Sequence, residues 1–362
     1  ALRSKGLSFH LIIYQMFKIP RFVQLTPFQC FSTKSRAKVV LCFPGQGSQY
    51  LGMCKEVVET VPEASKLMSN ASDVLGYDLL KVCTEGPKDL LDTTTVSQPA
   101  IFVASMCSVE KFKFQSSNDI NNTGKHILNQ ANECLGLSLG EYSALCHAKA
   151  FSFEDGVRLT KARGEAMQAA SDLVPTAMVS LVGLNQAKVE ELCEHVQLIT
   201  GKQIQIGNYL SQDMFVVSGD LEACQYIVKN KGKFKKKQNV GGDYSDLRLV
   251  KQLPVAGAFH TDFMKPALKP LQEVLNDIII KPPSLPVYSN VTGYYHDSTS
   301  SDSLLLLKQN LLKQVTCPVQ FSCSIEQMIK NSINDVVDNG YDGNDEVIGY
   351  EFGPGKAVSS II

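Results

Sequence analysis

The five residues Gly136-Leu137-Ser138-Leu139-Gly140 are the most informative stretch of the chain. In a G-x-S-x-G motif a sharp turn from a strand into a helix presents the serine oxygen, and amides at the start of that helix face a developing oxyanion. Residues 141–150 are typical of the expected helix, whereas Asn132 and Glu133 interrupt the expected strand. The motif therefore makes Ser138 a candidate nucleophile, with a chance match as the alternative.

Arg163 lies within the apolar stripe of a predicted helix. A capping-box start at Ser152 to Asp155 opens this helix, which continues through Met167. A guanidinium that faces the core needs a partner carboxylate, which either the protein or a substrate could supply. A buried ion pair, or a side chain whose charged end reaches water, is the structural alternative.

A serine nucleophile also needs a base, and His260 is the preferred one among six histidines. It follows the strand-like residues 253–259 and precedes a helix signal at 261–278. Catalytic groups collect in the loops at strand ends of α/β folds, so this position favours a catalytic role. A lone histidine is otherwise more often structural.

Strands and helices alternate from Val39 onward, which predicts an α/β fold. The apolar run 39–43 leads through Pro44-Gly45-Gln46-Gly47 into a helical pattern at 57–75. Tyr50 stands where a dinucleotide fingerprint needs its third glycine, so a Rossmann site is not expected. The Gly-Lys pair within 351–356 lacks the spacing of a P-loop and is interpreted as a structural turn.

Composition excludes several classes of protein. The chain has 362 residues, a length that fits one large domain or two modest ones. Thirty-five Lys+Arg and 36 Asp+Glu give a net charge of -1, so no global charge attracts nucleic acid or a membrane surface. No apolar run approaches the ~20 residues of a membrane span. Eleven scattered cysteines are interpreted as free thiols without a metal site.

Residues 1–37 have the composition of a mitochondrial transit peptide, because they are basic and the first acidic residue is Glu56. We therefore expect the protein in the mitochondrial matrix. Met16 opens a presequence-like start of its own, so residues 1–15 are interpreted as a non-native extension. An ordinary disordered basic tail is the alternative.

Several motifs occur together in one order along the chain. They are Phe43 to Gln49, Gln98-Pro99-Ala100, Gly136 to Glu141, Arg163 to Gln168, Gly257 to Met264 and Glu351 to Gly355. In this order the chain resembles malonyl-CoA:acyl carrier protein transacylases, most of all the mitochondrial members, over essentially its whole length after Lys38.

The resemblance implies an α/β-hydrolase-like large subdomain with an inserted small ferredoxin-like subdomain. The large subdomain would comprise residues 38–174 and 253–362, and the small one residues 175–252. An inserted-looking segment at Gly241 to Tyr244 leaves the boundary of the small subdomain open by several residues.

The resemblance also implies roles for matching residues. Ser138 would be the acylated nucleophile and His260 its base, while Arg163 would pair with the malonyl carboxylate. The main-chain carbonyl of Gln314 would orient His260, so that its side chain could vary. The amides of Gln46 and Leu139 would form the oxyanion hole, and Gln98 would contribute to substrate binding.

The implied activity is transfer of a malonyl group from malonyl-CoA to the phosphopantetheine thiol of acyl carrier protein, for fatty acid synthesis. The reaction would pass through a malonyl-serine in ping-pong fashion and need no metal, nicotinamide or flavin cofactor. Leu137 stands where bacterial members usually have histidine, and mitochondrial members also carry an apolar residue there.

Three alternative functions remain open at this stage. A serine hydrolase or thioesterase would share Ser138 and His260 but would not need Arg163. A related transacylase could prefer another acyl group, although the string Ala258-Phe259-His260 tends to accompany malonyl in extender-unit relatives. A catalytically silent binding module would form no acyl adduct.

One charged stretch stands out in a nearly neutral chain. It contains six lysines within nine residues, namely Lys229, Lys231, Lys233, Lys235, Lys236 and Lys237. Such a run is usually a solvated loop. The functional interpretation is that it docks an acidic acyl carrier protein and speeds the encounter.

Overall fold

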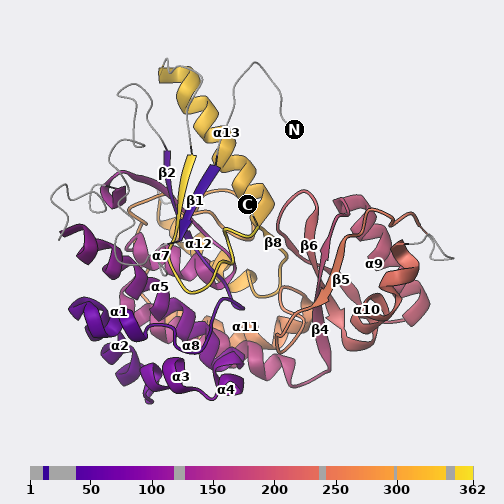
Figure 1. Cartoon of the computed structure of the whole chain (residues 1–362), viewed down its shortest axis with the longest axis horizontal. Helices are drawn as coiled ribbons and strands as arrows, with labels where there is room; N and C mark the ends of the chain where they lie inside the picture. The colour runs from indigo at the N-terminus through magenta and orange to yellow at the C-terminus, as the bar shows by residue number, and fades with distance from the viewer. Residues whose placement is uncertain are drawn as a thin grey trace.

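The computed structural model describes residues 11–15, 38–117, 127–235, 242–296, 300–339 and 347–361. These residues form two β-sheets with helices packed around them (Figure 1). The α/β class predicted from the alternation of strands and helices is confirmed. No helix in the described ranges is long and apolar enough to cross a bilayer.

The first sheet is parallel and has the strand order β1-β9-β2-β3. Its strands are β1 (Leu11–Gln15), β9 (Val347–Glu351), β2 (Lys38–Phe43) and β3 (Ala131–Gly136). Residues 39–43 of β2 are all buried, as expected for a parallel strand covered on both faces. This sheet carries the loops that follow β2 and β3.

Strand β1 lies inside the segment predicted to be a transit peptide. It pairs with β9 in register from Leu11 with Val347 to Gln15 with Glu351. The apolar sequence Leu-Ile-Ile-Tyr suits a strand at the edge of this sheet. The rest of residues 1–37 lies outside the described residues, so the transit peptide and its non-native extension stay predictions.

The polar residues expected to interrupt β3 are accommodated by specific partners. Asn132 Oδ1 accepts a hydrogen bond of 2.9 Å from the Val39 amide. Glu133 is 1% exposed, forms an ion pair with Lys38 and accepts a 2.5 Å hydrogen bond from the Tyr288 hydroxyl. Because these groups are satisfied within the fold, the strand continues to Gly136.

Helices surround the first sheet. They are α1 (Lys55–Thr60), α2 (Pro62–Leu75), α3 (Leu79–Glu85), α4 (Lys88–Asp92), α5 (Thr94–Ser117), α7 (Leu139–His147), α8 (Phe153–Ser171), α11 (Leu268–Asp277), α12 (Ser301–Lys313) and α13 (Phe321–Asn339). A Cβ on Gly164 would lie 2.6 Å from the Thr94 carbonyl oxygen, so this glycine permits the close approach of α8 to α5.

The single helix predicted for 261–278 is divided in the structure. A 3₁₀ helix, η1 (Asp262–Ala267), precedes α11, which begins at Leu268. Pro266 lies within η1 and has no amide hydrogen to continue a regular α-helical ladder. His260 therefore lies just before η1, which begins at Asp262.

The second sheet has the order β7-β4-β6-β5-β8. Its elements are β4 (Thr176–Val182), α9 (Gln186–Thr200), β5 (Ile204–Tyr209), β6 (Met214–Asp220), α10 (Leu221–Lys235) and β7 (Leu249–Gln252). Strands β7, β4, β6 and β5 are antiparallel, and this β-α-β-β-α-β series is ferredoxin-like. The fifth strand, β8 (Val319–Gln320), comes from later in the chain and pairs with β5 in parallel.

Each sheet has its own hydrophobic core. Val179, Leu181 and Val217 belong to the core of the second sheet, whereas Leu41 and Phe43 belong to the larger core around the first. The second sheet with α9 and α10 occupies one end of the molecule (Figure 1). The limits 175–252 for a small subdomain remain a prediction, because β8 also belongs to this sheet.

Candidate active site

The turn after β3 holds Ser138 in a strained backbone conformation. Its φ is 52° and ψ is -103°, and α7 begins at the next residue. A Cβ on Gly136 would lie 2.1 Å from the Gly140 carbonyl carbon, and a Cβ on Gly140 would lie 2.1 Å from the Phe43 carbonyl oxygen. Both glycines of the motif are therefore required by this strand-turn-helix geometry.

Asn290 ties this turn together, and sequence reasoning missed it. Its Oδ1 accepts a 2.5 Å hydrogen bond from the Ser138 amide, and its Nδ2 donates to the Gly136 carbonyl at 2.7 Å. The segment that carries it runs beside β3, where the Tyr288 amide donates to the Cys134 carbonyl. No motif marks Asn290, since its partner groups are main-chain atoms 150 or so residues away.

His260 contacts both Ser138 and Gln314. Its Nε2 lies 2.9 Å from Ser138 Oγ, and its Nδ1 lies 2.8 Å from the Gln314 carbonyl oxygen. A neutral imidazole with its proton on Nδ1 can donate to that carbonyl and accept from the serine hydroxyl. The His260 amide also donates to the Val315 carbonyl at 3.1 Å, which fixes the backbone of the residue.

Burial keeps this imidazole neutral. His260 is 3% exposed, and burial together with the positive charge of Arg163 lowers its pKa to about 3. The unprotonated form, which a general base needs, is therefore the form present at neutral pH.

Arg163, on α8, is 1% exposed and points at the serine. Its Nη1 donates to Gln98 Oε1 at 2.8 Å, while its Nη2 donates to Gln314 Oε1 at 2.8 Å and to Ser138 Oγ at 3.0 Å. The guanidinium carbon lies 5.4 Å from the centre of the Tyr142 ring. Burial lowers the pKa of Arg163, and its contact with Tyr142 acts in the opposite direction.

No carboxylate of the described residues forms an ion pair with Arg163. Its three recorded hydrogen bonds go to two amide oxygens and a hydroxyl, and its Nε has no acceptor there. A buried guanidinium normally needs an anionic partner. This arrangement can therefore receive the carboxylate of a bound molecule close to Ser138.

The two predicted oxyanion-hole residues lie on adjacent loops. Leu139 is the first residue of α7, and Gln46 follows β2. A Cβ on Gly45 would lie 2.5 Å from the Leu137 carbonyl oxygen, so the two loops are in contact. Within the described part of the chain, neither the Gln46 nor the Leu139 amide has a recorded acceptor.

The side chain of Gln314 forms hydrogen bonds of its own, in addition to the main-chain contact with His260. Its Nε2 donates to the Ser138 carbonyl at 3.0 Å and to Glu141 Oε2 at 2.5 Å, while its Oε1 accepts from Arg163. The residue caps the end of α12 and is 1% exposed. Glu141 is the last residue of the motif Gly136 to Glu141, and no sequence pattern predicted its contact with Gln314.

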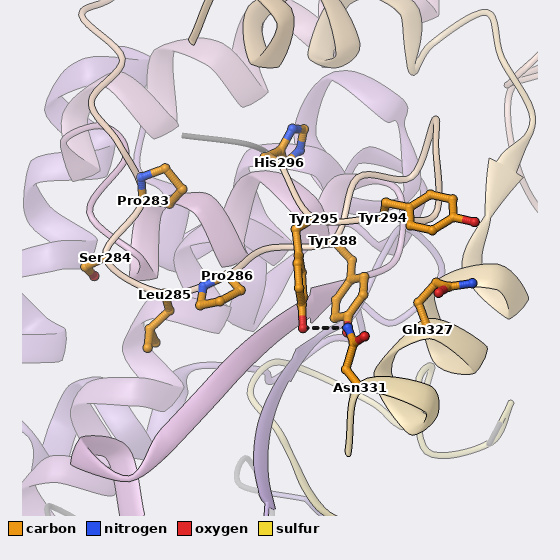
Figure 2. Close-up of a pocket in the computed structure, with 10 residues that line it drawn as sticks. All are labelled: Pro283, Ser284, Leu285, Pro286, Tyr288, Tyr294, Tyr295, His296, Gln327 and Asn331. Carbon is orange, nitrogen blue, oxygen red and sulfur yellow. Dashed lines mark hydrogen bonds between the residues drawn. The ribbon is translucent and has the colours of Figure 1, made fainter. Parts of the chain in front are cut away.

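A cavity of about 600 Å³ lies beside α13 (Figure 2). Its lining comprises Pro283, Ser284, Leu285, Pro286, Tyr288, Tyr294, Tyr295, His296, Gln327 and Asn331. None of the residues around Ser138 that sequence analysis singled out belongs to it. Within the described ranges, no three or more His, Cys, Asp or Glu side chains are grouped so that they could hold a metal ion.

The lysine run is only partly described. Lys229, Lys231 and Lys233 are exposed on α10, which packs on the second sheet. The Lys235 side chain, Lys236 and Lys237 lie outside the described residues. The structure thus shows three exposed lysines and leaves their partner unassigned.

Comparison with known proteins gives one consistent result. Residues 40–337 match the family model described as an acyl transferase domain. The chain is 36% identical to the mouse protein named "Malonyl-CoA-acyl carrier protein transacylase, mitochondrial", and the match covers 89% of this chain and 77% of that protein.

Solved structures agree with this match. An acyl-carrier-protein S-malonyltransferase from Bartonella henselae superposes with a TM-score of 0.72 at 30% identity, over 90% of this chain and 91% of that one. A malonyl-transacylase solved in complex with its type II polyketide acyl-carrier protein gives a TM-score of 0.69 at 28% identity, over 90% of this chain and 92% of that one.

Proposed function

Since the chain belongs to the malonyl-CoA:acyl carrier protein transacylases of the acyl transferase family, we propose how its own residues perform the reaction. The enzyme transfers a malonyl group from malonyl-CoA to acyl carrier protein for fatty acid synthesis. One observation carries the proposal: Arg163 is buried beside Ser138 Oγ, and no carboxylate of the described residues forms an ion pair with it.

In the first half-reaction Ser138 Oγ attacks the thioester carbonyl of malonyl-CoA, and its proton passes to His260 Nε2. The resulting oxyanion is stabilised by the amides of Gln46 and Leu139. The carbon–sulfur bond then breaks, and His260 passes this proton to the coenzyme A sulfur. Malonyl remains as an ester on Ser138. The 2.9 Å contact between Ser138 Oγ and His260 Nε2 supports this assignment.

The second half-reaction reverses these steps with a different thiol. The phosphopantetheine thiol of acyl carrier protein gives its proton to His260 and attacks the malonyl ester. The carbon–oxygen bond to Ser138 breaks, and Oγ recovers its proton from His260. No metal or redox cofactor is needed in this proposal, because Ser138, His260 and the two thiols supply every proton and electron pair.

Arg163 would bind the malonyl carboxylate in both half-reactions. In the free enzyme one of its donors is used by Ser138 Oγ at 3.0 Å. Once Oγ becomes an ester oxygen, it is a poorer acceptor, and that donor can turn to the carboxylate. A charge-assisted hydrogen bond of this kind is stronger than the one it replaces. Gln98 would assist by holding Nη1 at 2.8 Å.

A serine hydrolase or thioesterase is the competing function. It would release coenzyme A from malonyl-CoA continuously in the absence of acyl carrier protein. The transacylase proposal expects one burst of coenzyme A per enzyme without the carrier, followed by steady release only when the carrier is added. Equal steady rates with and without acyl carrier protein would reject the proposal.

Two further assignments concern the docking of the carrier protein and the location of the enzyme. The exposed Lys229, Lys231 and Lys233 would contribute to docking of acyl carrier protein.

The mitochondrial name of the mouse relative supports a location in the mitochondrial matrix. Import of the full chain into isolated mitochondria, with protection from added protease, would test this location.

A further inference from the structure

The side chain of Gln314 joins three parts of the active site. Its Oε1 accepts from Arg163 Nη2 at 2.8 Å. Its Nε2 donates to the Ser138 carbonyl at 3.0 Å and to Glu141 Oε2 at 2.5 Å. The same residue uses its main-chain carbonyl, 2.8 Å from His260 Nδ1, for a separate contact.

Only one orientation of the Gln314 amide satisfies these neighbours. An ionised carboxylate and a main-chain carbonyl are acceptors without hydrogens, whereas a guanidinium is a donor without a lone pair. Glu141 and the Ser138 carbonyl therefore require the NH₂ group, and Arg163 requires the oxygen. The carboxylate of Glu141 thereby directs the Gln314 oxygen toward Arg163.

Glu141 is itself held in place from several sides. It is completely buried, and its Oε2 also accepts from the Asn290 amide at 3.0 Å. Its Oε1 lies 2.7 Å from His296 Nε2. The His296 side chain, labelled in Figure 2, comes from the same segment as Asn290. A carboxylate fixed in this way presents a rigid acceptor to Gln314.

We propose that Glu141 and the Gln314 side chain form a positioning pair that aims Arg163 at the acyl group on Ser138, and so set the preference for an acyl group that carries a carboxylate. This inference rests on the proposed role of Arg163. Gln314 then has two separable tasks. Its main-chain carbonyl orients His260 for every substrate, whereas its side chain affects charged substrates more than uncharged ones.

The first test is Gln314→Met, which removes the amide, keeps a similar length and retains the main-chain carbonyl. Two rates are compared with wild type: acylation of Ser138 by malonyl-CoA, and labelling of Ser138 by an uncharged fluorophosphonate ester. We expect malonyl acylation to fall about tenfold or more, as for loss of a hydrogen bond to a charged group, and labelling to fall by a clearly smaller factor, since Gln314 Nε2 also donates to the Ser138 carbonyl. Equal losses in both rates, or no loss in either, would overturn the inference.

The second test is Glu141→Gln, which keeps the shape of the side chain and removes its charge. If its oxygen still faces Gln314, its NH₂ group must face His296 Nε2, which now requires the opposite tautomer of that ring. The buried Nδ1 of His296, which has no hydrogen-bond partner among the described residues, would then carry an unpaired N–H. We expect the ratio of malonyl acylation to fluorophosphonate labelling to fall. A rise would mean that Glu141 acts only as a charge opposing the substrate carboxylate, and would overturn the inference.

Two controls keep the result specific. Glu133→Gln makes the same chemical change at another buried carboxylate, on β3, and should leave the ratio unchanged. The double variant Glu141→Gln/Gln314→Met should match Gln314→Met alone, since both changes act through one contact. Additive losses would show that Glu141 acts independently of Gln314.

Arg163→Ala, measured alongside, separates failure of this inference from failure of the proposed function. If Arg163→Ala leaves the ratio unchanged, the role of Arg163 itself is wrong. If Arg163→Ala lowers the ratio and Gln314→Met does not, only the positioning pair is rejected. Should Glu141→Gln fail to fold, the Gln314→Met result decides the matter by itself.

Discussion

Arg163 Nη2 lies 3.0 Å from Ser138 Oγ, so the guanidinium proposed to bind substrate contacts the nucleophile directly in the free enzyme. The same hydroxyl lies 2.9 Å from His260 Nε2. Ser138 can therefore donate to the imidazole while it accepts from the guanidinium. Recognition of a charged acyl group and activation of the serine share one oxygen atom, and changes at Arg163 are expected to affect both.

The Arg163→Ala change should reduce malonyl transfer far more than acetyl transfer. Loss of a charge-assisted hydrogen bond to the carboxylate is expected to lower kcat/KM for malonyl-CoA by about 10²-fold or more, whereas the acetyl group has no carboxylate to lose. Steady-state assays with both thioesters and one carrier protein measure the ratio.

Arg163→Lys is the matched control for charge. It should recover only part of the malonyl activity, because an ammonium cannot reproduce the two-pronged geometry of a guanidinium. If malonyl and acetyl transfer fall equally in Arg163→Ala, the residue serves the fold rather than the choice of substrate.

Acylation should remain insensitive to mild acid. The pKa of His260 is lowered to about 3 by burial and by Arg163, so the imidazole stays neutral well below the 6.5 of an ordinary histidine. Rates of Ser138 acylation by malonyl-CoA, measured from pH 8 to pH 5, are expected to stay nearly constant. A fall to half near pH 6.5 would mean that His260 is not buried as described or is not the base.

The same shift predicts a pH dependence of stability. Because the pKa of His260 is lower in the folded than in the unfolded chain, protons bind the unfolded chain first as the pH falls below about 6.5. The free energy of unfolding should therefore decrease between pH 6.5 and pH 3, with this residue contributing about 1.4 kcal/mol per pH unit. Urea unfolding of wild type and His260→Gln at pH 7 and pH 5 isolates the contribution. Identical pH dependence in both proteins would contradict it.

Asn290→Ala should damage the serine turn. The change leaves the Ser138 amide and the Gly136 carbonyl without their partner, and each buried unpaired group costs about 1–3 kcal/mol. We expect a lower melting temperature together with slower fluorophosphonate labelling of Ser138. Asn331→Ala is the control. It removes an asparagine of α13 that lines the cavity beside this helix, and it should leave the labelling rate unchanged.

Charge reversal on α10 tests carrier docking. Lys229, Lys231 and Lys233 are exposed, so their replacement by Glu should not disturb the core. If they attract an acidic carrier protein, acylation by malonyl-CoA stays the same while transfer to the carrier slows, most at low salt. Changes in both half-reactions, or in neither, would place the carrier elsewhere.

Sequence reasoning reached the fold class and the candidate residues for different reasons. The alternation of strands and helices predicted the α/β class. The G-x-S-x-G motif predicted the strained turn, because a side chain at either glycine would collide with the main chain there. The roles of Gln314 and Gln46 came from family resemblance, since main-chain atoms leave no mark in side-chain chemistry. The structure then brings Ser138, His260, Arg163 and Gln314 into one hydrogen-bonded cluster.

Other features could not be predicted because they depend on distant contacts. Glu133 was expected to interrupt the strand, because its ion pair with Lys38 and its hydrogen bond from Tyr288 cannot be read from the sequence. Asn290 belongs to no recognisable motif. Its side chain hydrogen-bonds to the Ser138 amide and the Gly136 carbonyl, which are distant in the sequence. The contacts of the Gln314 side chain could not be predicted, because the expected main-chain role does not depend on that side chain.

The most direct test of the account is the site of acylation. Wild type and Ser138→Ala are mixed with malonyl-CoA, and intact mass followed by peptide mapping locates any adduct. We expect one malonyl group on Ser138 of wild type, discharged by acyl carrier protein, and no adduct in Ser138→Ala. A full adduct in Ser138→Ala, or wild type that transfers malonyl without ever forming the ester, would contradict it.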